Sequence, residues 1–310
     1  MSMIDGQDTY EAMFLNYLER ERRVPIETLR GYGDDVDYFK AFLDRQLVEY
    51  SWTSVDTEII RAWVVSMAGK GNKPSVIRRR IAGIRAFYRF LQRIGKVAVN
   101  PALRLPLPKV PKRLPRFISV EGMEKLGSGH LFPSDFSGHR DRLILELLYG
   151  TGMRRAEVAN LKESDIQWER KEINVLGKGG KSRVIPVVSS LYSLLTKYRD
   201  ERNSLFEKGA VTFFVTDKGR DIYTRFVYAV SIRYLGMVTS IENKGPHLLR
   251  HTFATHLMSN GADIQAVKAL LGHSSLAATQ VYMHNSAERL KKIYNQAHPK
   301  AQRKRPDDNG

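Results

Sequence analysis

The sequence lacks cysteine, and it lacks a long hydrophobic segment. The first absence excludes disulfide scaffolds, thiolate zinc sites and a cysteine nucleophile. No apolar run approaches the roughly 18 residues that a membrane span needs, and the opening MSMIDGQDTY lacks the basic and then apolar order of a signal peptide. We therefore expect a soluble, cytoplasmic protein with no membrane span.

Acidic residues are scarce relative to basic ones. The 310 residues include 50 Lys and Arg but only 33 Asp and Glu, which gives a formal net charge of +17. Such an excess favours a polyanionic partner, either nucleic acid or an anionic membrane surface. The length exceeds that of a usual single domain, and 42% of the residues are hydrophobic, so we expect two domains with real cores.

The first hundred residues contain segments in which apolar residues recur every three or four positions. This spacing predicts four helices and a small bundle over residues 1–104. The last segment, SVIRRRIAGIRAFYRFLQRIG, also carries arginines on its polar side, with almost no acidic partners nearby. A charge run is usually a solvated face, but the missing partners favour phosphate contact. The candidate DNA contacts here are Arg78, Arg79, Arg80 and Arg85.

A proline-rich stretch, NPALRLPLPKVPKRLPRF, follows the bundle. Its prolines disfavour both helix and central strand, so residues 105–117 are predicted to form an extended, basic linker. Such a linker is either an inert spacer or a segment that follows a phosphate backbone. Lys109 and Lys112 are its candidate DNA contacts.

Residues 118–300 are predicted to form a second domain, of the α+β class. Helical spacing dominates it, VTFFV is a candidate strand, and KEINVLGKGGKSRVIPV predicts a β-hairpin with Lys178 and Lys181 at its tip and Arg183 beyond it. The glycines match no nucleotide-binding motif. The fold is thus mainly α with a small β-sheet or hairpin, and residues 301–310 form a polar tail that we expect to be disordered.

The stretch from Pro246 to Tyr282 groups several reactive side chains. HLLRHTFATHLM predicts a helix that places His247 and Arg250 on one face. A second helix, DIQAVKALL, ends at Gly272. His273 follows directly, and the next short helix carries Tyr282 on its last turn.

These residue types suit phosphodiester cleavage. Arginine, here Arg154 and Arg250, can stabilise charge on the nonbridging oxygens, and histidine can move protons near neutral pH. A lysine on the hairpin can protonate the leaving oxygen, and tyrosine can act as nucleophile where a positive field favours its phenolate. Any one of the 14 tyrosines is by default a packing residue. The joint pattern is what favours catalysis.

The motifs TGMRRAEVANL, LGKGGKSR, HLLRHTFATHL and LGHSSLAATQVYMH resemble those of the tyrosine recombinases, a family of site-specific DNA recombinases and phage-type integrases. The resemblance covers essentially the whole chain and is strongest to bacterial Xer-type members. It implies an N-terminal four-helix, SAM-like core-binding domain that clamps DNA, followed by a tyrosine recombinase catalytic domain. The implied catalytic residues are Arg154, Lys178, His247, Arg250, His273 and Tyr282.

By the same resemblance, Tyr282 forms a 3′-phosphotyrosyl link to DNA without metal, nucleotide or other cofactor. Glu157 is expected to hold the arginine helix by a charged hydrogen bond, and His251 to have a packing or supporting role. Lys181 and Arg183 are further candidate DNA contacts.

The resemblance also implies partners. Family members recombine two double-stranded DNA sites as a tetramer through a Holliday junction, and the segment Ser286–His298 resembles the C-terminal helix that reaches a neighbouring subunit. The implied role is chromosome dimer resolution, and hence chromosome partition during cell division. The alternative is DNA integration or excision for a mobile element. Action alone or with a paralogous recombinase, and with or without a DNA translocase, stay open.

Other functions fit the sequence less well. His247 and His251 have the spacing of a zinc helix, but the glutamate that such a helix needs is absent, and a two-metal nuclease would need acidic motifs. A non-catalytic DNA-binding protein would not explain the set of six residues. A type IB topoisomerase shares the chemistry but not the Xer-like bundle and tail.

Overall fold

The structure is a computed structural model, and it describes residues 9–46, 49–109, 116–177, 182–207, 209–272, 293–294 and 296–300. The chain divides into two compact units, Met1–Arg113 and Leu114–Gly310. Each is described by itself. Among the described residues, no helix combines the length and the apolar character needed to cross a membrane.

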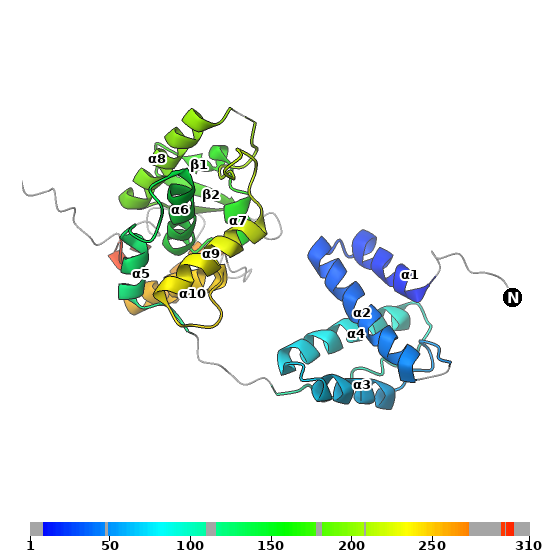
Figure 1. The fold of residues 1–310 in the computed structure, drawn as a ribbon. Coiled ribbons are helices and arrows are strands. Elements are labelled where there is room, and N and C mark those ends of the chain that lie inside the picture. The colour runs from blue at the N-terminus through cyan, green and yellow to red at the C-terminus, as the bar shows by residue number, and fades with distance from the viewer. Residues whose placement is uncertain are drawn as a thin grey trace, which may run out of the picture. The chain divides into compact units, whose positions relative to one another are not determined.

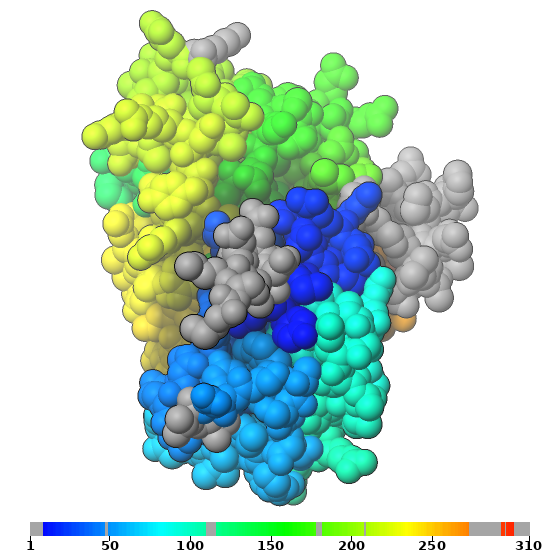
Figure 2. All heavy atoms as spheres, turned by 90° about the vertical axis from the view of Figure 1, so that its right-hand side faces the viewer, coloured from blue at the N-terminus to red at the C-terminus, as the bar shows by residue number. Residues whose placement is uncertain are grey.

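The first unit is helical, as the sequence predicts (Figure 1). Its elements are α1 (Tyr10–Asn16), which continues into a turn of π-helix, η1 (Tyr17–Glu21), then α2 (Ile26–Gln46), α3 (Thr57–Gly69) and α4 (Pro74–Arg93). In the space-filling view, α1 is dark blue and the cyan α4 lies beside it (Figure 2). Aromatic rings fill the core, with the ring centres of Phe39 and Trp63 4.7 Å apart.

Two arginines of α4 have acidic partners within this unit, so the premise of almost no acidic partners does not hold for them. Arg79 pairs with the buried Asp35 at 2.7 Å, and Arg93 pairs with Glu21 at 2.8 Å. The acidic residues come from α2 and η1, distant in sequence, which is why the pattern within α4 does not reveal them. The Arg80 guanidinium carbon lies 3.5 Å from the ring centre of Tyr38.

Arg85 fastens the chain that leaves α4. Its Nε donates to the carbonyl of Ala102 at 2.9 Å, and its Nη2 donates to the carbonyl of Leu105, also at 2.9 Å. Ala102 and Leu105 are buried in the core of the first unit. The proline-rich stretch is therefore packed against the bundle as far as Leu105, the first residue of the predicted linker.

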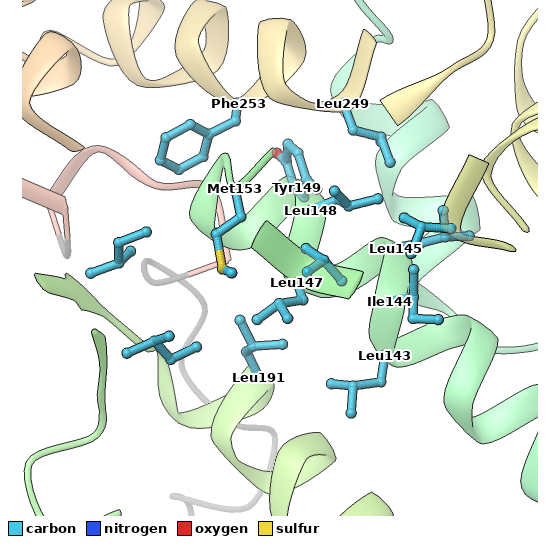
Figure 3. Packing of buried hydrophobic residues seen from close by; sticks show 14 of the residues in the cluster. Leu143, Ile144, Leu145, Leu147, Leu148, Tyr149, Met153, Leu191, Leu249 and Phe253 are labelled. Atoms are coloured by element: carbon cyan, nitrogen blue, oxygen red, sulfur yellow. The ribbon is translucent and has the colours of Figure 1, made fainter. Parts of the chain in front are cut away.

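The second unit is built around a buried helix. Its helices are α5 (Val120–Gly127), α6 (Phe136–Thr151), α7 (Arg155–Ala159), α8 (Ser189–Leu205), α9 (Thr224–Val238), α10 (Pro246–Ser259) and α11 (Ile264–Leu271), with a 3-10 turn, η2 (Glu163–Asp165), after α7. Helix α6 contacts α8, α9 and α10. Figure 3 shows its leucines packing toward Leu191 of α8 on one side and toward Leu249 and Phe253 of α10 on the other.

A three-stranded antiparallel sheet completes this unit. Strand β2 (Glu172–Leu176) pairs with β3 (Ser182–Pro186), which confirms the predicted hairpin, and a two-residue strand, β1 (Ile166–Gln167), pairs with the other edge of β2. Ile173 and Val175 are buried, and the residues that alternate with them are not.

The expectation of a strand at VTFFV is wrong. Phe213 and Phe214 are consecutive and both fully buried, so the segment lacks the alternation of a strand. The amide of Phe213 donates to the carbonyl of Leu161 and that of Val215 to the hydroxyl of Tyr198. Among the described residues, this segment pairs through an isolated bridge, Val215 to Asp221.

The described residues near the C-terminus pack on their own chain. The ring of Tyr294 is fully buried, and its hydroxyl donates to the carbonyl of Gly150 at the end of α6. Asn260 donates to the carbonyl of Ala297 at 2.7 Å, and Lys300 pairs with Glu146. The rest of the predicted assembly segment Ser286–His298 lies outside the described residues, as does the predicted tail 301–310.

Candidate active site

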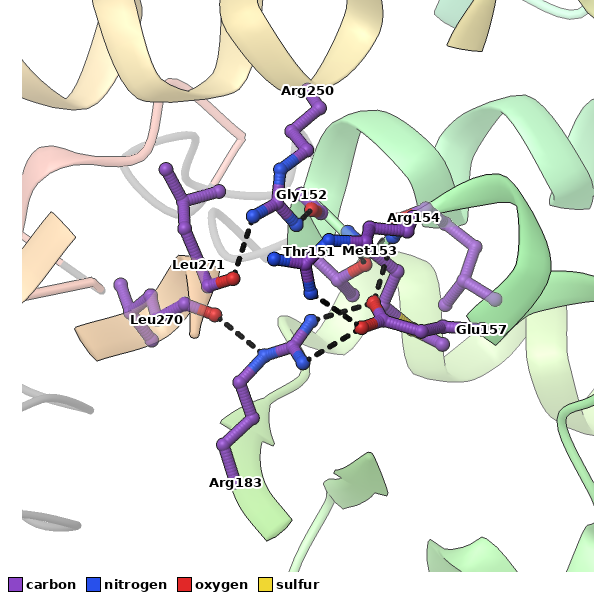
Figure 4. A network of polar contacts seen from close by, with 10 residues as sticks. Thr151, Gly152, Met153, Arg154, Glu157, Arg183, Arg250, Leu270 and Leu271 are labelled. Carbon is purple, nitrogen blue, oxygen red and sulfur yellow. Dashed lines mark hydrogen bonds and ion pairs between the residues drawn. The ribbon is translucent and has the colours of Figure 1, made fainter. Parts of the chain in front are cut away.

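Arg250 is the most buried side chain of the predicted catalytic set within the described chain. It is the fifth residue of α10, and 8% of its surface is exposed. One Nη donates to the carbonyl of Gly152 and the other to the carbonyl of Leu271, both at 2.6 Å (Figure 4). Burial and the neighbouring charge of Arg154 lower the pKa of Arg250 to about 10, so it remains protonated at neutral pH.

Gly152 lets α6 and α10 approach at this point. It ends α6 in the left-handed conformation with φ of +62°, which glycine adopts without strain. A Cβ atom here would lie 2.6 Å from Phe253 and 2.8 Å from Leu271. Glycine therefore both turns the chain toward α7 and brings the acceptor carbonyl to Arg250.

Arg154 caps α7, two residues beyond that turn. Its amide donates to the Glu157 carboxylate at 2.7 Å, and its Nη1 donates to the same group at 2.8 Å. The hydrogen bond expected between Glu157 and the arginine helix is thus present. The Arg154 side chain keeps 35% of its surface exposed, so its guanidinium is accessible to an anion.

Glu157 is shared with a second arginine, Arg183 of β3. The two Nη groups of Arg183 donate to the two carboxylate oxygens at 3.0 and 2.7 Å, and its Nε donates to the carbonyl of Leu270 at 2.9 Å. Burial raises the pKa of Glu157, but the hydrogen bonds from Arg183 and from the amide of Arg154 outweigh that effect and hold it below the usual value. The carboxylate is therefore ionised at neutral pH.

His247 lies at the start of α10 and is exposed. Partial desolvation lowers its pKa, and the positive charges of Arg155, Arg250 and Arg154 lower it further. The imidazole is therefore neutral at neutral pH and can accept a proton or a hydrogen bond. An arriving phosphate would oppose these charges and raise the pKa again.

A cavity of about 520 Å³ opens beside these groups, between α7 and β2. Arg154 and Glu157 line it from the helix, and Asn174 and Gly177 line it from the strand. Lys162 and Asp165 also line it, so the charges on its walls balance. The excess of positive charge comes from Arg183, which pairs with Glu157, and from Arg250, which lies close enough to Arg154 for their charges to interact. Such a site favours an anion.

Comparison with known proteins shows to which family this chain belongs. Residues 130–289 match the model of the phage integrase family, and residues 12–95 match that of the phage integrase N-terminal SAM-like domain. The chain belongs to the phage integrase family. A tyrosine recombinase XerC of Chlorobaculum tepidum is 36% identical to it, over 93% of this chain and 94% of the relative. That of Bacillus pumilus is also 36% identical, over 93% and 96%.

A solved structure shares the fold of these integrases. It is the XerH site-specific recombinase bound to palindromic difH substrate in a post-cleavage complex, with a TM-score of 0.69 and 22% identity, over 91% of this chain and 83% of that one. The family models and the XerC relatives confirm the predicted membership of the tyrosine recombinases. The mainly helical fold with a SAM-like N-terminal part and a small sheet is also confirmed.

Within this integrase frame, the structure brings together some of the predicted catalytic residues. Arg154 and Arg250 lie in one network, although 96 positions separate them in sequence (Figure 4). The positive charges of both arginines lower the pKa of His247. Lys178, His273 and Tyr282 lie outside the described residues.

The supporting residues vary in what they contact. Glu157 has the expected contacts. His251 is partly buried on α10, and its Nε2 has no hydrogen-bond partner in the described chain. Arg183 was predicted as a DNA contact, but 10% of its side chain is exposed and its guanidinium donates within the protein. The sequence motif predicts the pairing of Arg154 with Glu157, three residues later. No pattern in the sequence predicts that Arg183 pairs with the same glutamate.

The other candidate DNA contacts also differ in exposure. Arg78, Arg79 and Lys109 are exposed, although Arg79 also donates to Asp35. Arg80 and Arg85 are partly buried, and Arg85 donates to backbone carbonyls as described above. Lys112 and Lys181 lie outside the described residues.

Proposed function

We propose that the protein is a site-specific recombinase that cuts and rejoins double-stranded DNA through a 3′-phosphotyrosyl intermediate on Tyr282. The observation that carries this proposal is the convergence of Arg154 and Arg250 beside Glu157, in a family of tyrosine recombinases. Planar arginine forks match phosphate oxygens and stay charged. They suit a transition state that gathers negative charge.

The steps follow from these groups. The Tyr282 hydroxyl gives up its proton, which the neutral His247 can accept, and its oxygen bonds to the scissile phosphorus as the bond to the 5′ oxygen breaks. Arg154, Arg250 and His273 stabilise the charged phosphorane. Lys178 gives a proton to the departing 5′ oxygen, and the neutral His247 assists proton transfer or contacts the phosphate. The new phosphoester conserves the energy of the old one, so a 5′ hydroxyl from a second duplex can reverse the step and exchange strands.

The biological role we propose is chromosome dimer resolution, in the cytoplasm. The XerC identity of relatives that match over nine-tenths of the chain supports it over mobile-element integration. The XerH structure is a complex with a difH substrate, which supports a DNA recombination site as the partner here. Assembly into a tetramer through the segment Ser286–His298 would require Tyr294 and Ala297 to exchange their own-chain contacts for those of a neighbour.

A suicide substrate tests the chemistry. The full chain is incubated in EDTA with a nicked duplex carrying the candidate inverted-repeat site, and covalent protein–DNA adduct is measured. We expect wild type to form the adduct and Tyr282→Phe to bind the duplex equally well but form none. Adduct from Tyr282→Phe, or none from a wild type that binds the site tightly, would refute the mechanism.

A further inference from the structure

Arg183 occupies a position where separate parts of the second unit meet. It is the second residue of β3 and lies opposite Val175 in the hairpin. Through Glu157 it reaches α7, and through the carbonyl of Leu270 it reaches the last turn of α11. Its contacts therefore join segments that are 26 and 87 residues away in sequence.

The side chain fits closely where it crosses α11. Gly272 ends that helix with φ of +66°, and a Cβ atom there would lie 3.1 Å from the Cδ and 3.2 Å from the Nη1 of Arg183. The neighbouring carbonyl of Leu271 is the acceptor for Arg250. Consecutive carbonyls at the end of α11 thus hold Arg183 and Arg250.

The charge balance gives Arg183 a second effect. Each carboxylate oxygen of Glu157 accepts one bond from Arg183 and one from Arg154. The bidentate pair with Arg183 compensates the carboxylate charge, so Arg154 is oriented by Glu157 and keeps its own charge for an anion. Without Arg183, Glu157 and Arg154 would form a simple neutralising pair.

We propose that Arg183 is a positioning residue for DNA strand cleavage. It holds Glu157 so that Arg154 is fixed but not neutralised, and it ties β3 to the end of α11 beside Arg250. It does this from inside the protein and makes no contact with the phosphate. The proposal rests on the recombinase function given above.

The experiment compares Arg183→Met with a matched control, Arg202→Met, in the full chain. Arg202 is similarly buried, with 13% of its side chain exposed, and it also joins a glutamate, Glu163, to a backbone carbonyl, that of Phe213, but neither partner bonds to Arg154, Glu157 or Arg250 among the described residues. Cleavage rate on the nicked substrate and affinity for the intact duplex are measured for both.

We expect Arg183→Met to cleave about 10- to 100-fold more slowly, the scale of a small misplacement of catalytic groups, while its DNA affinity stays within about twofold, less than a single lost phosphate contact would cost. Arg202→Met should retain the wild-type rate. Arg183→Met cleaving at the wild-type rate, or losing rate and affinity together, would overturn the proposal, the second outcome marking Arg183 as a DNA contact. An equal loss in Arg202→Met would mark a general effect of instability.

Two further measurements keep the result unambiguous. Because part of the effect of Arg183 runs through Glu157, Arg183→Met should slow cleavage less in a Glu157→Gln background than in wild type, whereas fully multiplied losses would contradict the route through Glu157. Hydrogen exchange in Arg183→Met should accelerate in both α7 and the end of α11, and unchanged exchange there would refute the tie even if cleavage assays fail. No adduct from wild type would instead count against the recombinase mechanism.

Discussion

Gly152→Ala should destabilise the second unit strongly, because the methyl group meets two penalties at once. The residue has φ of +62°, and its Cβ would lie 2.6 Å from Phe253 and 2.8 Å from Leu271, both in the core. Neither neighbour can move freely, since Phe253 is fully buried and Leu271 adjoins the α11 cap.

The expected magnitude follows from these terms. A left-handed alanine costs ~1–2 kcal/mol, and forcing a methyl group into a packed core costs ~1–3 kcal/mol. The sum, ~2–5 kcal/mol, corresponds to a fall in melting temperature of ~4–20 °C for a unit of this size. Gly261→Ala is the matched control, because Gly261 also has positive φ, +83°, yet nothing lies within 4 Å of its Cβ position. Gly261→Ala should therefore be destabilised only by the cost of a left-handed alanine.

Calorimetry of the full chain measures both variants. Gly71→Ala, with φ of +74° and open space around it, marks the transition of the first unit, so the transition of the second can be assigned. We expect Gly152→Ala to lower the second-unit transition well below that of Gly261→Ala. Equal shifts would show that α6 and α10 yield to the methyl group and would refute the steric argument.

The remaining predictions concern acid and salt. Burial lowers the pKa of His256 and lowers that of His298 to about 3. Both histidines resist protonation in the folded protein, whereas in the unfolded chain they take up a proton below the ordinary histidine pKa of about 6.5. The free energy of unfolding should therefore fall as the pH falls below this value, by up to ~1.4 kcal/mol per pH unit for each histidine. Melting curves between pH 7 and 5 should show this loss, and His298→Gln should flatten it; an unchanged slope would contradict the assignment. For DNA binding, the exposed Arg78 is the better candidate contact: Arg78→Ala should reduce the salt slope of affinity by ~0.9. Arg85→Ala should leave the slope unchanged and lower stability instead, since its donors hold Ala102 and Leu105; the opposite pattern would show that these roles are reversed.

The sequence predicts those parts of the structure that local periodicity encodes. In α4, Ile77, Ile81 and Ile84 repeat at helical spacing, and all are buried. Ile173 and Val175 alternate with less buried residues, which is the two-residue period of a strand, and both are buried in β2. The chain turns at Gly152 and Gly272 were predictable because glycine ends helices in the left-handed conformation.

What the sequence hides are pairings between distant segments. Asp35 and Arg79 are 44 residues apart, and Arg183 and Leu270 are 87 apart, so no local pattern joins them. An arginine looks the same in sequence whether it faces DNA or a buried carboxylate. The candidate site was predictable to the extent that its motifs place arginines near turns, but not the use of Glu157 by two arginines at once.

This sharing explains how a buried arginine can serve as a ready phosphate ligand. Arg250 gives one bond from each Nη to a backbone carbonyl, which fixes its plane and leaves further N–H groups of the fork for another acceptor. Because those acceptors are neutral carbonyls, the charge of Arg250 is not cancelled. Arg154 keeps its charge by a different route, since Arg183 balances Glu157. Both arginines are thus oriented before an anion arrives, and little reorganisation remains to be done when charge develops on a phosphate.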